Sequence, residues 1–277
     1  MQLFLSVATL YIIGLGIHPE LITLRAVEIV RRVRFVFYET YTSPISRESI
    51  VEMLRSLCNV DSKSIMELTR RDIEDESCRK IVEVLDSGND AALLVPGDPM
   101  IATTHNAVRV IVGKRGHRVE IVFGVSILCA AISATGLSSY RFGPVSTVTY
   151  PRMGVLSERP YEVTRDNLSR NLHTLLLLDI HDSGRYMTIP EAAKILLELE
   201  NRRREGVFNE NRPIICIARL GSPTSHISVT RLKDALRMDL GEPPHTIIVP
   251  ARLTPIEAEI LRTEFNAPED ILRELSP

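Results

Sequence analysis

The chain has 277 residues, of which 44% are hydrophobic and 25% are charged, and its formal net charge is −2. These values are typical of a globular protein with one large domain or two ordinary ones, and they exclude a disordered or collagen-like chain. The near-neutral charge gives no reason to expect nucleic acid or an anionic membrane as a partner.

The cysteines and histidines are scattered without the spacing of a metal site. Four cysteines occur, at Cys58, Cys78, Cys129 and Cys216, and no Cys-x-x-Cys or His-Glu-x-x-His unit is present. We therefore expect no metal, reduced cysteines and a cytoplasmic location.

The first seventeen residues, "MQLFLSVATLYIIGLGI", carry no charge. A signal peptide would begin with basic residues, and a membrane span needs roughly 20 apolar residues. We expect a buried strand over residues 10–13, preceded by an extension of nine residues, and no contact with a membrane.

Short apolar runs alternate with longer amphipathic runs through the first half of the chain. The pattern predicts strands at 10–13, 35–39, 64–68, 91–95 and 119–123, and helices at 24–33, 50–57, 78–86 and 107–115. Such alternation indicates a parallel sheet with helices on its faces.

A helix of small residues is expected at 127–137, and Gly143 and Pro144 then break the helical period. We place a domain boundary there, which gives an N-terminal α/β domain over 10–142 and a C-terminal α/β domain over 143–277. In the second domain we expect strands at 145–150, 174–180, 213–220 and 246–250. The helices expected between them lie around 158–171, 190–203, 230–238 and 254–264.

Turn-forming residues follow five of the predicted strands. These turns read "GLGIHPE", "PGDPMIA", "GVSIL", "DIHDSG" and "RLGSP". Because ligands of open α/β sheets bind outside the carboxyl ends of the strands, the five turns together predict a cleft for a small molecule.

The first turn is not a dinucleotide-binding fingerprint. That motif needs a third glycine where this chain has Pro19, and Glu39 is the only candidate for an acid that binds a ribose. No Walker loop or Gly-x-Ser-x-Gly elbow is present either, so an NAD enzyme, a P-loop protein and a serine hydrolase are disfavoured.

Asp98 in "PGDP" has two readings. It can cap the next helix, with Pro99 at the first helical position. It can also meet a cationic or hydrogen-bond-donating ligand, because it follows a predicted strand directly. Both can hold together.

Several segments carry a resemblance to a known family: "YIIGLGIHPELITLRAVEIV", "PGDPMIATTH", "GVSILCAAISATGL", "LHTLLLLDI", "ARLGS" and "GEPPHTIIVP". From about residue 10 to near the C-terminus, the chain resembles the diphthine synthases, which are tetrapyrrole methylase-like, class III S-adenosylmethionine-dependent methyltransferases. The resemblance implies two α/β domains, each with a central sheet flanked by helices, the cofactor in the interdomain cleft, and usually a homodimer. It also implies methylation of the amine of the modified histidine of translation elongation factor 2 in diphthamide biosynthesis.

The resemblance further implies a cofactor pocket and no metal. Carried over position by position, the pocket residues are Ile17, Asp98, Ile101, Ser126, Ile127, Leu178, Leu220 and His245. No catalytic residue is assigned. Arg185 and Arg219 are candidates for holding the carboxylate of the acceptor.

Other functions remain open from the residues alone. A porphyrin-precursor methyltransferase or a ribosomal RNA ribose methylase would share the Gly-Asp-Pro turn, although an RNA enzyme would need a basic face. A non-catalytic module that only binds the cofactor is the alternative from another class.

Overall fold

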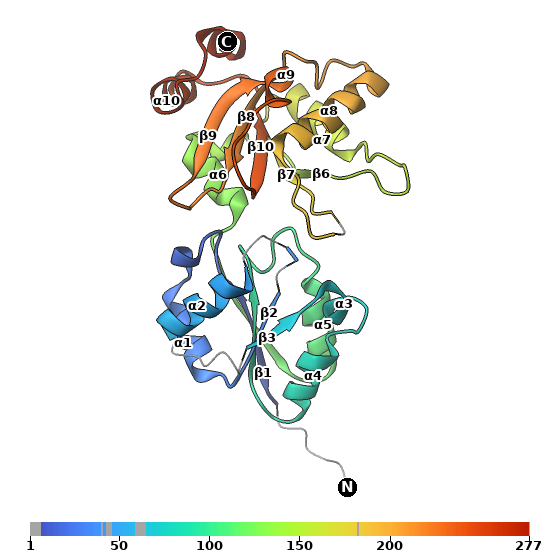
Figure 1. The fold of residues 1–277 in the computed structure, drawn as a ribbon, viewed down its shortest axis with the longest axis vertical. Helices are drawn as coiled ribbons and strands as arrows, with labels where there is room; N and C mark the ends of the chain where they lie inside the picture. Colours follow the sequence, from blue (N-terminus) through green and yellow to red (C-terminus); the bar gives the residue numbers. More distant parts are fainter. Residues whose placement is uncertain (1–6, 40, 43–45, 59–64, 182, 277) are drawn as a thin grey trace. The chain divides into compact units, whose positions relative to one another are not determined.

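The computed structural model describes residues 7–39, 41–42, 46–58, 65–181 and 183–276, and Figure 1 shows their fold. The chain divides into two compact units between Ile127 and Leu128, and each unit is an α/β structure built around its own sheet.

The first unit contains a five-stranded parallel sheet. Its strands are β1 (Thr9–Gly14), β2 (Phe35–Glu39), β3 (Ile65–Leu68), β4 (Ala91–Val95) and β5 (Arg118–Val122), in the order β3-β2-β4-β1-β5. All five residues of β4 are buried, as expected of a central strand that is covered on both faces. The predicted parallel sheet is confirmed.

Helices cover both faces of this sheet. One face packs against α1 (Leu24–Arg32) and α2 (Arg47–Cys58), and the other packs against α3 (Arg70–Ile73), α4 (Arg79–Asp86) and α5 (Asn106–Lys114). A short 3-10 helix, η1 (Pro19–Leu21), follows β1. Because strand side chains alternate between faces, Leu10 and Ile12 join one apolar cluster while Ile13 joins the other.

The second unit contains a five-stranded mixed sheet. Its strands are β6 (Ser146–Val148), β7 (Thr174–Leu178), β10 (His245–Val249), β8 (Pro213–Ala218) and β9 (His226–Arg231), in that spatial order. Only β6 and β7 are parallel, and β10 runs antiparallel to both of its neighbours. Strand β9 occupies a stretch where we expected a loop and the start of a helix.

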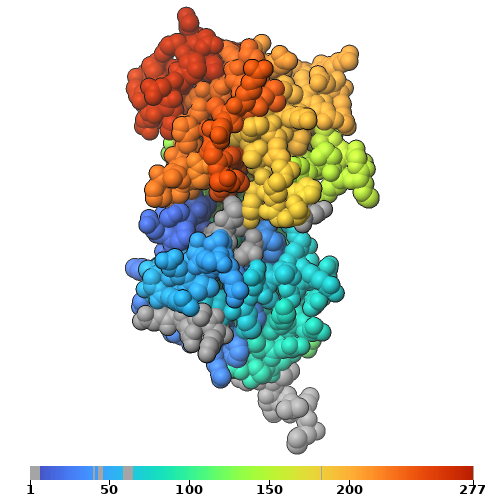
Figure 2. Space-filling view, viewed as in Figure 1, coloured from blue at the N-terminus to red at the C-terminus, as the bar shows by residue number. Residues whose placement is uncertain are grey.

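The helices of the second unit form two groups. Helices α7 (Arg159–Ser169), α8 (Ile189–Arg203) and α9 (Leu232–Ala235) contribute to one apolar core with the sheet. The others are α6 (Ile127–Thr135), η3 (Ser139–Arg141), α10 (Pro255–Phe265) and α11 (Glu269–Leu275). Helices α10 and α11, in red in Figure 2, lie together at one end of this unit.

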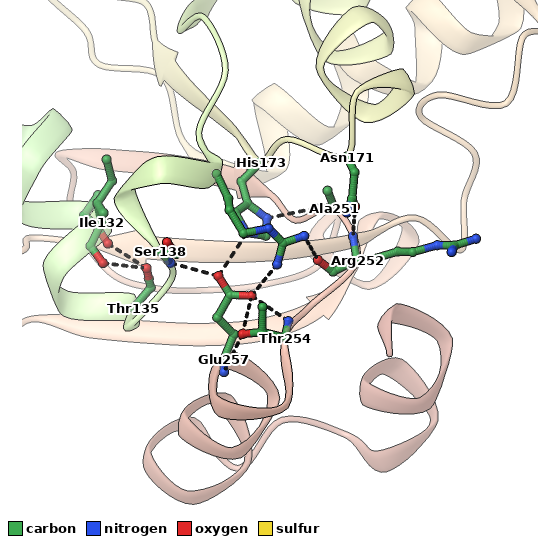
Figure 3. A network of polar contacts seen from close by, with 11 residues as sticks. Ile132, Thr135, Ser138, Asn171, His173, Ala251, Arg252, Thr254 and Glu257 are labelled. Atoms are coloured by element: carbon green, nitrogen blue, oxygen red, sulfur yellow. Dashed lines mark hydrogen bonds and ion pairs between the residues drawn. The ribbon is translucent and has the colours of Figure 1, made fainter. Parts of the chain in front are cut away.

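The observed division lies earlier than the expected boundary at 142/143. A buried carboxylate at the start of α10 binds the segment that follows α6: Glu257 accepts hydrogen bonds from the backbone of Ser138 and from the guanidinium of Arg141 (Figure 3). These bonds hold residues 128–142 in the second unit. Gly143 and Pro144 therefore mark a turn inside that unit.

Candidate functional site

The ends of β1 and β4 lie at the point where the first sheet reverses its winding. From β1 the chain goes to β2 on one side, and from β4 it goes to β5 on the other side. The crevice outside the carboxyl ends of two such neighbouring strands is the usual ligand site of an open α/β sheet. The turns "GLGI" and "PGDP" lie at this position.

Glycines allow three strand ends to meet backbone to backbone here. The backbone N–H of Gly97 donates to Gly16 O at 2.8 Å, and that of Gly16 donates to Gly97 O at 3.1 Å. A Cβ atom on Gly124 would lie 2.2 Å from Gly97 O, so no side chain fits there. Gly97 itself has a φ of +72° and open space on its Cβ side, so the turn leaves room beside this residue.

Asp98 joins the turn after β4 to the turn after β5. One carboxylate oxygen accepts from Met100 N at 2.9 Å, and the other accepts from Gly124 N at 3.4 Å. The helix-capping reading is wrong, since α5 begins only at Asn106 and its N-cap is His105. Asp98 instead caps a tight turn, and its side chain remains partly accessible.

The remaining expected residues of this unit lie at the same edge. Ile17 follows the β1 turn and is half-buried, whereas Ile101 is 41% exposed. Ser126 is buried after β5, and Ile127 begins α6. The three turns thus combine backbone groups, one carboxylate and accessible aliphatic side chains.

The expected residues of the second unit also share one edge of its sheet. Because β10 runs antiparallel to β7 and β8, the first residue of β10, His245, lies beside the last residues of those strands. His245 pairs in register with Ala218, and Leu178 ends β7. Leu220 follows β8 by two residues and is half-buried.

His245 carries a buried polar atom that lacks a partner. The side chain is buried, and its Nδ1 accepts from Ile189 N at 3.3 Å, which places the proton on Nε2. That Nε2 has no hydrogen-bond partner among the described residues. Burial, and next the charge of Arg219, lower the pKa of the ring, which favours its neutral form.

The two arginines considered for the acceptor are already engaged. Arg219 donates to the carbonyls of Leu240, Glu242 and Thr224, so it ties two loops together. Arg185 pairs with Glu191 and lies 5.4 Å from the centre of the Tyr150 ring. Arg219 is therefore a structural residue of the loops that flank His245.

Glu39 is not a ribose-binding residue. It is fully buried at the end of β2, where its carboxylate accepts from the backbone of Tyr41 and Thr42 and from the Thr42 hydroxyl. These bonds cap the turn that leaves β2. The sequence pattern showed an acid at a strand end but not which way it points.

The cavity found in the second unit lies elsewhere. It has a volume of about 460 Å³ and is lined by Leu168, Ser169, Asn171, Arg212, Pro250, Ala251, Arg252, Glu274 and Leu275. Since Pro250 and Ala251 follow the carboxyl end of β10, this cavity is at the edge opposite His245.

Comparison with known proteins gives a consistent answer. The family model "Tetrapyrrole (Corrin/Porphyrin) Methylases" matches residues 9–236. A diphthine synthase of Pyrobaculum islandicum is 47% identical over 91% of this chain and 98% of its own length. One from Methanocaldococcus jannaschii is 36% identical over 91% of this chain and 97% of its own. The chain belongs to the diphthine synthase family.

Solved structures agree with this assignment. A crystal structure of diphthine synthase matches with a TM-score of 0.83 and 33% identity, and it covers 96% of this chain and 99% of its own. The protein is therefore a methyltransferase with the tetrapyrrole methylase fold, and the expected fold class and enzyme class are confirmed.

None of the helices in the described residues has both the length and the apolar character of a membrane span. Within the same residues, no group of three or more His, Cys, Asp or Glu side chains is placed to hold a metal ion.

Proposed function

We propose that this family member transfers methyl groups from S-adenosylmethionine to the amine of the modified histidine of translation elongation factor 2. The observation that carries the proposal is the 47% identity to a diphthine synthase over nearly the full length of both chains. We further propose a homodimer in the cytoplasm, with the elongation factor as protein substrate and with neither nucleic acid nor membrane as a partner.

The residues at the first sheet's carboxyl edge suit the cofactor. The carboxylate of Asp98 can accept further hydrogen bonds and suits the amine of an amino acid moiety, and the open space beside Gly97 leaves room for it. Exposed Ile101 and half-buried Ile17 offer apolar surface for a purine or a thioether. Ser126 and Ile127 would complete this half of the pocket.

The second unit would contribute Leu178, Leu220 and His245. The unpartnered Nε2 donor of His245 supports this assignment, because a buried donor without an acceptor costs about 1–3 kcal/mol and a ligand acceptor would remove that cost. Arg219 would keep the surrounding loops in place.

The chemistry needs positioning more than acid–base residues. When bound, S-adenosylmethionine supplies a methyl group that is already activated by a sulfonium. The protein then has to hold a neutral amine in line with that group at roughly 3 Å and exclude competing water. We assign no catalytic residue for the removal of the amine's proton.

The proposal is tested by transfer of a labelled methyl group. The purified protein is incubated with labelled S-adenosylmethionine and one of three acceptors. These are elongation factor 2 that carries the aminocarboxypropyl arm on its histidine, the unmodified factor, and uroporphyrinogen. We expect label only in the first, gained in steps of one methyl by mass spectrometry, because the unmodified factor lacks the nucleophilic amine.

Other outcomes would replace the proposal. Efficient labelling of uroporphyrinogen alone would identify a porphyrin-precursor methyltransferase. Cofactor binding without transfer to any of the three would favour a non-catalytic module.

A further inference from the structure

The loop between β4 and α5, residues 96–105, is held in an unfavourable conformation. Ala102 has a φ of +54°, in the left-handed region that non-glycine residues seldom adopt. Because this region is sterically unfavourable for a residue with a side chain, contacts elsewhere in the loop must fix it. The loop carries Asp98 and Ile101, two of the proposed cofactor contacts.

His105 fixes the far end of this loop. Its side chain is fully buried, and its Nδ1 lies 2.7 Å from Thr103 Oγ1 and 3.3 Å from Pro99 O. One ring nitrogen therefore reaches both the residue after Asp98 and the residue after Ala102.

The neighbours of the ring determine its protonation. Pro99 O can only accept a hydrogen bond, which places the proton on Nδ1. The other nitrogen, Nε2, lies 3.3 Å from the Tyr41 hydroxyl and accepts from it. Burial lowers the pKa of His105, in keeping with a neutral ring.

Tyr41 is itself anchored to the end of the neighbouring strand. Its backbone N–H donates to Glu39 at 3.0 Å, and the guanidinium of Arg70 lies 5.4 Å from the centre of its ring. Glu39 is the last residue of β2, which pairs with β4. A chain of contacts thus runs from the end of β2 through Tyr41 and His105 to the loop that follows β4.

We propose that His105, oriented by Tyr41, is a positioning residue for methyl transfer: it holds the 96–105 loop in the conformation that presents Asp98 and Ile101 to the cofactor. This inference rests on the proposed function. Because His105 is fully buried, it acts through the loop and does not touch the substrate.

The test compares substitutions that keep different parts of the ring's hydrogen bonding. In His105→Asn the side-chain amide can replace Nδ1 and still donate to Pro99 O, whereas in His105→Gln it reaches toward Tyr41 instead. Tyr41→Phe removes only the hydroxyl that orients the ring. The matched control is His117→Gln, since His117 is a buried histidine at the amino end of β5 that bonds Asp86 at 2.9 Å.

The readouts are the dissociation constant of S-adenosylhomocysteine by calorimetry, the KM for S-adenosylmethionine, and thermal unfolding. Since misplacement of a binding group by about 1 Å can cost a hundredfold, we expect His105→Gln to raise the dissociation constant and KM by roughly tenfold to a hundredfold. His105→Asn should stay close to wild type and Tyr41→Phe should fall between them. His117→Gln should lower the unfolding temperature without changing affinity.

Two results would overturn the inference. One is wild-type cofactor affinity in both His105→Gln and Tyr41→Phe. The other is an equal loss of cofactor affinity in His105→Asn, His105→Gln and His117→Gln, in proportion to their loss of stability. That result would mean that His105 only supports the fold. If the wild-type protein binds no S-adenosylhomocysteine, the proposed function itself is wrong. That result is distinct from the two above, because it appears in the wild-type protein and does not depend on the variants.

Discussion

Asp98 joins the turn after β4 to the turn after β5, and a substitution can test the role of its negative charge. Its carboxylate accepts from Met100 N and Gly124 N. Asn can keep the first of these bonds but not the negative charge. We expect Asp98→Asn to leave the melting temperature of the free protein within a few degrees of wild type.

The same substitution should weaken binding of S-adenosylhomocysteine by roughly tenfold to a hundredfold, since a hydrogen bond to a charged group contributes about 1.5–3 kcal/mol. Titration calorimetry measures this. Asp86→Asn, at the opposite edge of the sheet beside His117, is the control and should bind normally. Equal affinity in the two variants would limit Asp98 to a structural role in its turn.

Glu39 makes stability depend on pH in a direction that is uncommon for a carboxylate. Burial raises its pKa to about 7, although bonds from Thr42 and Tyr41 and the charge of Arg70 oppose the shift. The folded protein therefore holds this proton to a higher pH than the unfolded chain does. The free energy of unfolding should fall as the pH rises from about 4.5 to about 7.

Glu39→Gln should remove the decrease in the free energy of unfolding between about pH 4.5 and about pH 7. That decrease is on the order of 3 kcal/mol for a pKa shift of this size. Urea unfolding at pH 5 and at pH 7.5 measures the difference for each protein. Glu83→Gln, on the exposed side of α4, should keep the wild-type dependence. The raised pKa would be contradicted if the wild-type protein were more stable at pH 7.5 than at pH 5 and Glu39→Gln showed the same pH dependence.

Residue patterns located the strand ends but not the contacts between them. The sequence pointed to the glycine turns, Asp98 and His245. The turns after β1, β4 and β5, with Asp98, lie at the carboxyl edge of the first sheet, and His245 lies beside the carboxyl end of β8 in the second. The bond between Tyr41 and His105 joins residues 64 positions apart, so no local pattern could predict it. The sequence likewise could not predict the orientation of the buried Glu39 side chain.

At the scale of elements, periodicity predicted most of the longer helices and the parallel first sheet, but it gave no strand directions for the second unit and did not predict α11. Helices α8 and α10 begin within one residue of the expected positions, because Pro190 and Pro255 mark their first turns. Apolar content identified β10 as a strand but not as antiparallel, since side-chain period is the same in both directions. Strand β9 was missed because only one of its six residues is buried.

Glu257 joins three elements of the second unit and should dominate the stability of α10. It forms a capping box with Thr254, accepts from Ser138 N at 2.8 Å and pairs with Arg141 at 2.6 Å (Figure 3). Burial alone would raise its pKa, but hydrogen bonds from Thr254 and Ser138 outweigh burial and lower it. The folded state therefore holds an ionised carboxylate with several donors.

Removing this carboxylate leaves Arg141 without its ion-pair partner and His173 Nε2 without its carboxylate partner. We expect Glu257→Ala to lower the free energy of unfolding by about 3–5 kcal/mol, as for other broken buried ion pairs. Glu259→Ala, on the exposed side of the same helix, should cost less than about 1 kcal/mol even though it breaks a pair with Arg262. Chemical denaturation followed by circular dichroism compares them, and similar losses would show that Glu257 is not a stabilising hub.

At the scale of the whole molecule, two separate α/β units each present their proposed cofactor residues at one edge of a sheet. In the first unit these residues lie after β1, β4 and β5. In the second they lie at the end of β7, after β8 and at the start of β10. We propose that S-adenosylmethionine binds to residues of both edges.

Hydrogen–deuterium exchange with and without saturating S-adenosylhomocysteine tests that claim most directly. We expect slower exchange in peptides from both units, over residues 14–17, 96–105 and 124–127 and over residues 178–180, 219–222 and 244–246. Peptides around the cavity lined by Arg212 and Arg252 should not change. Protection confined to one unit, or found at that cavity and not at the two edges, would contradict the account.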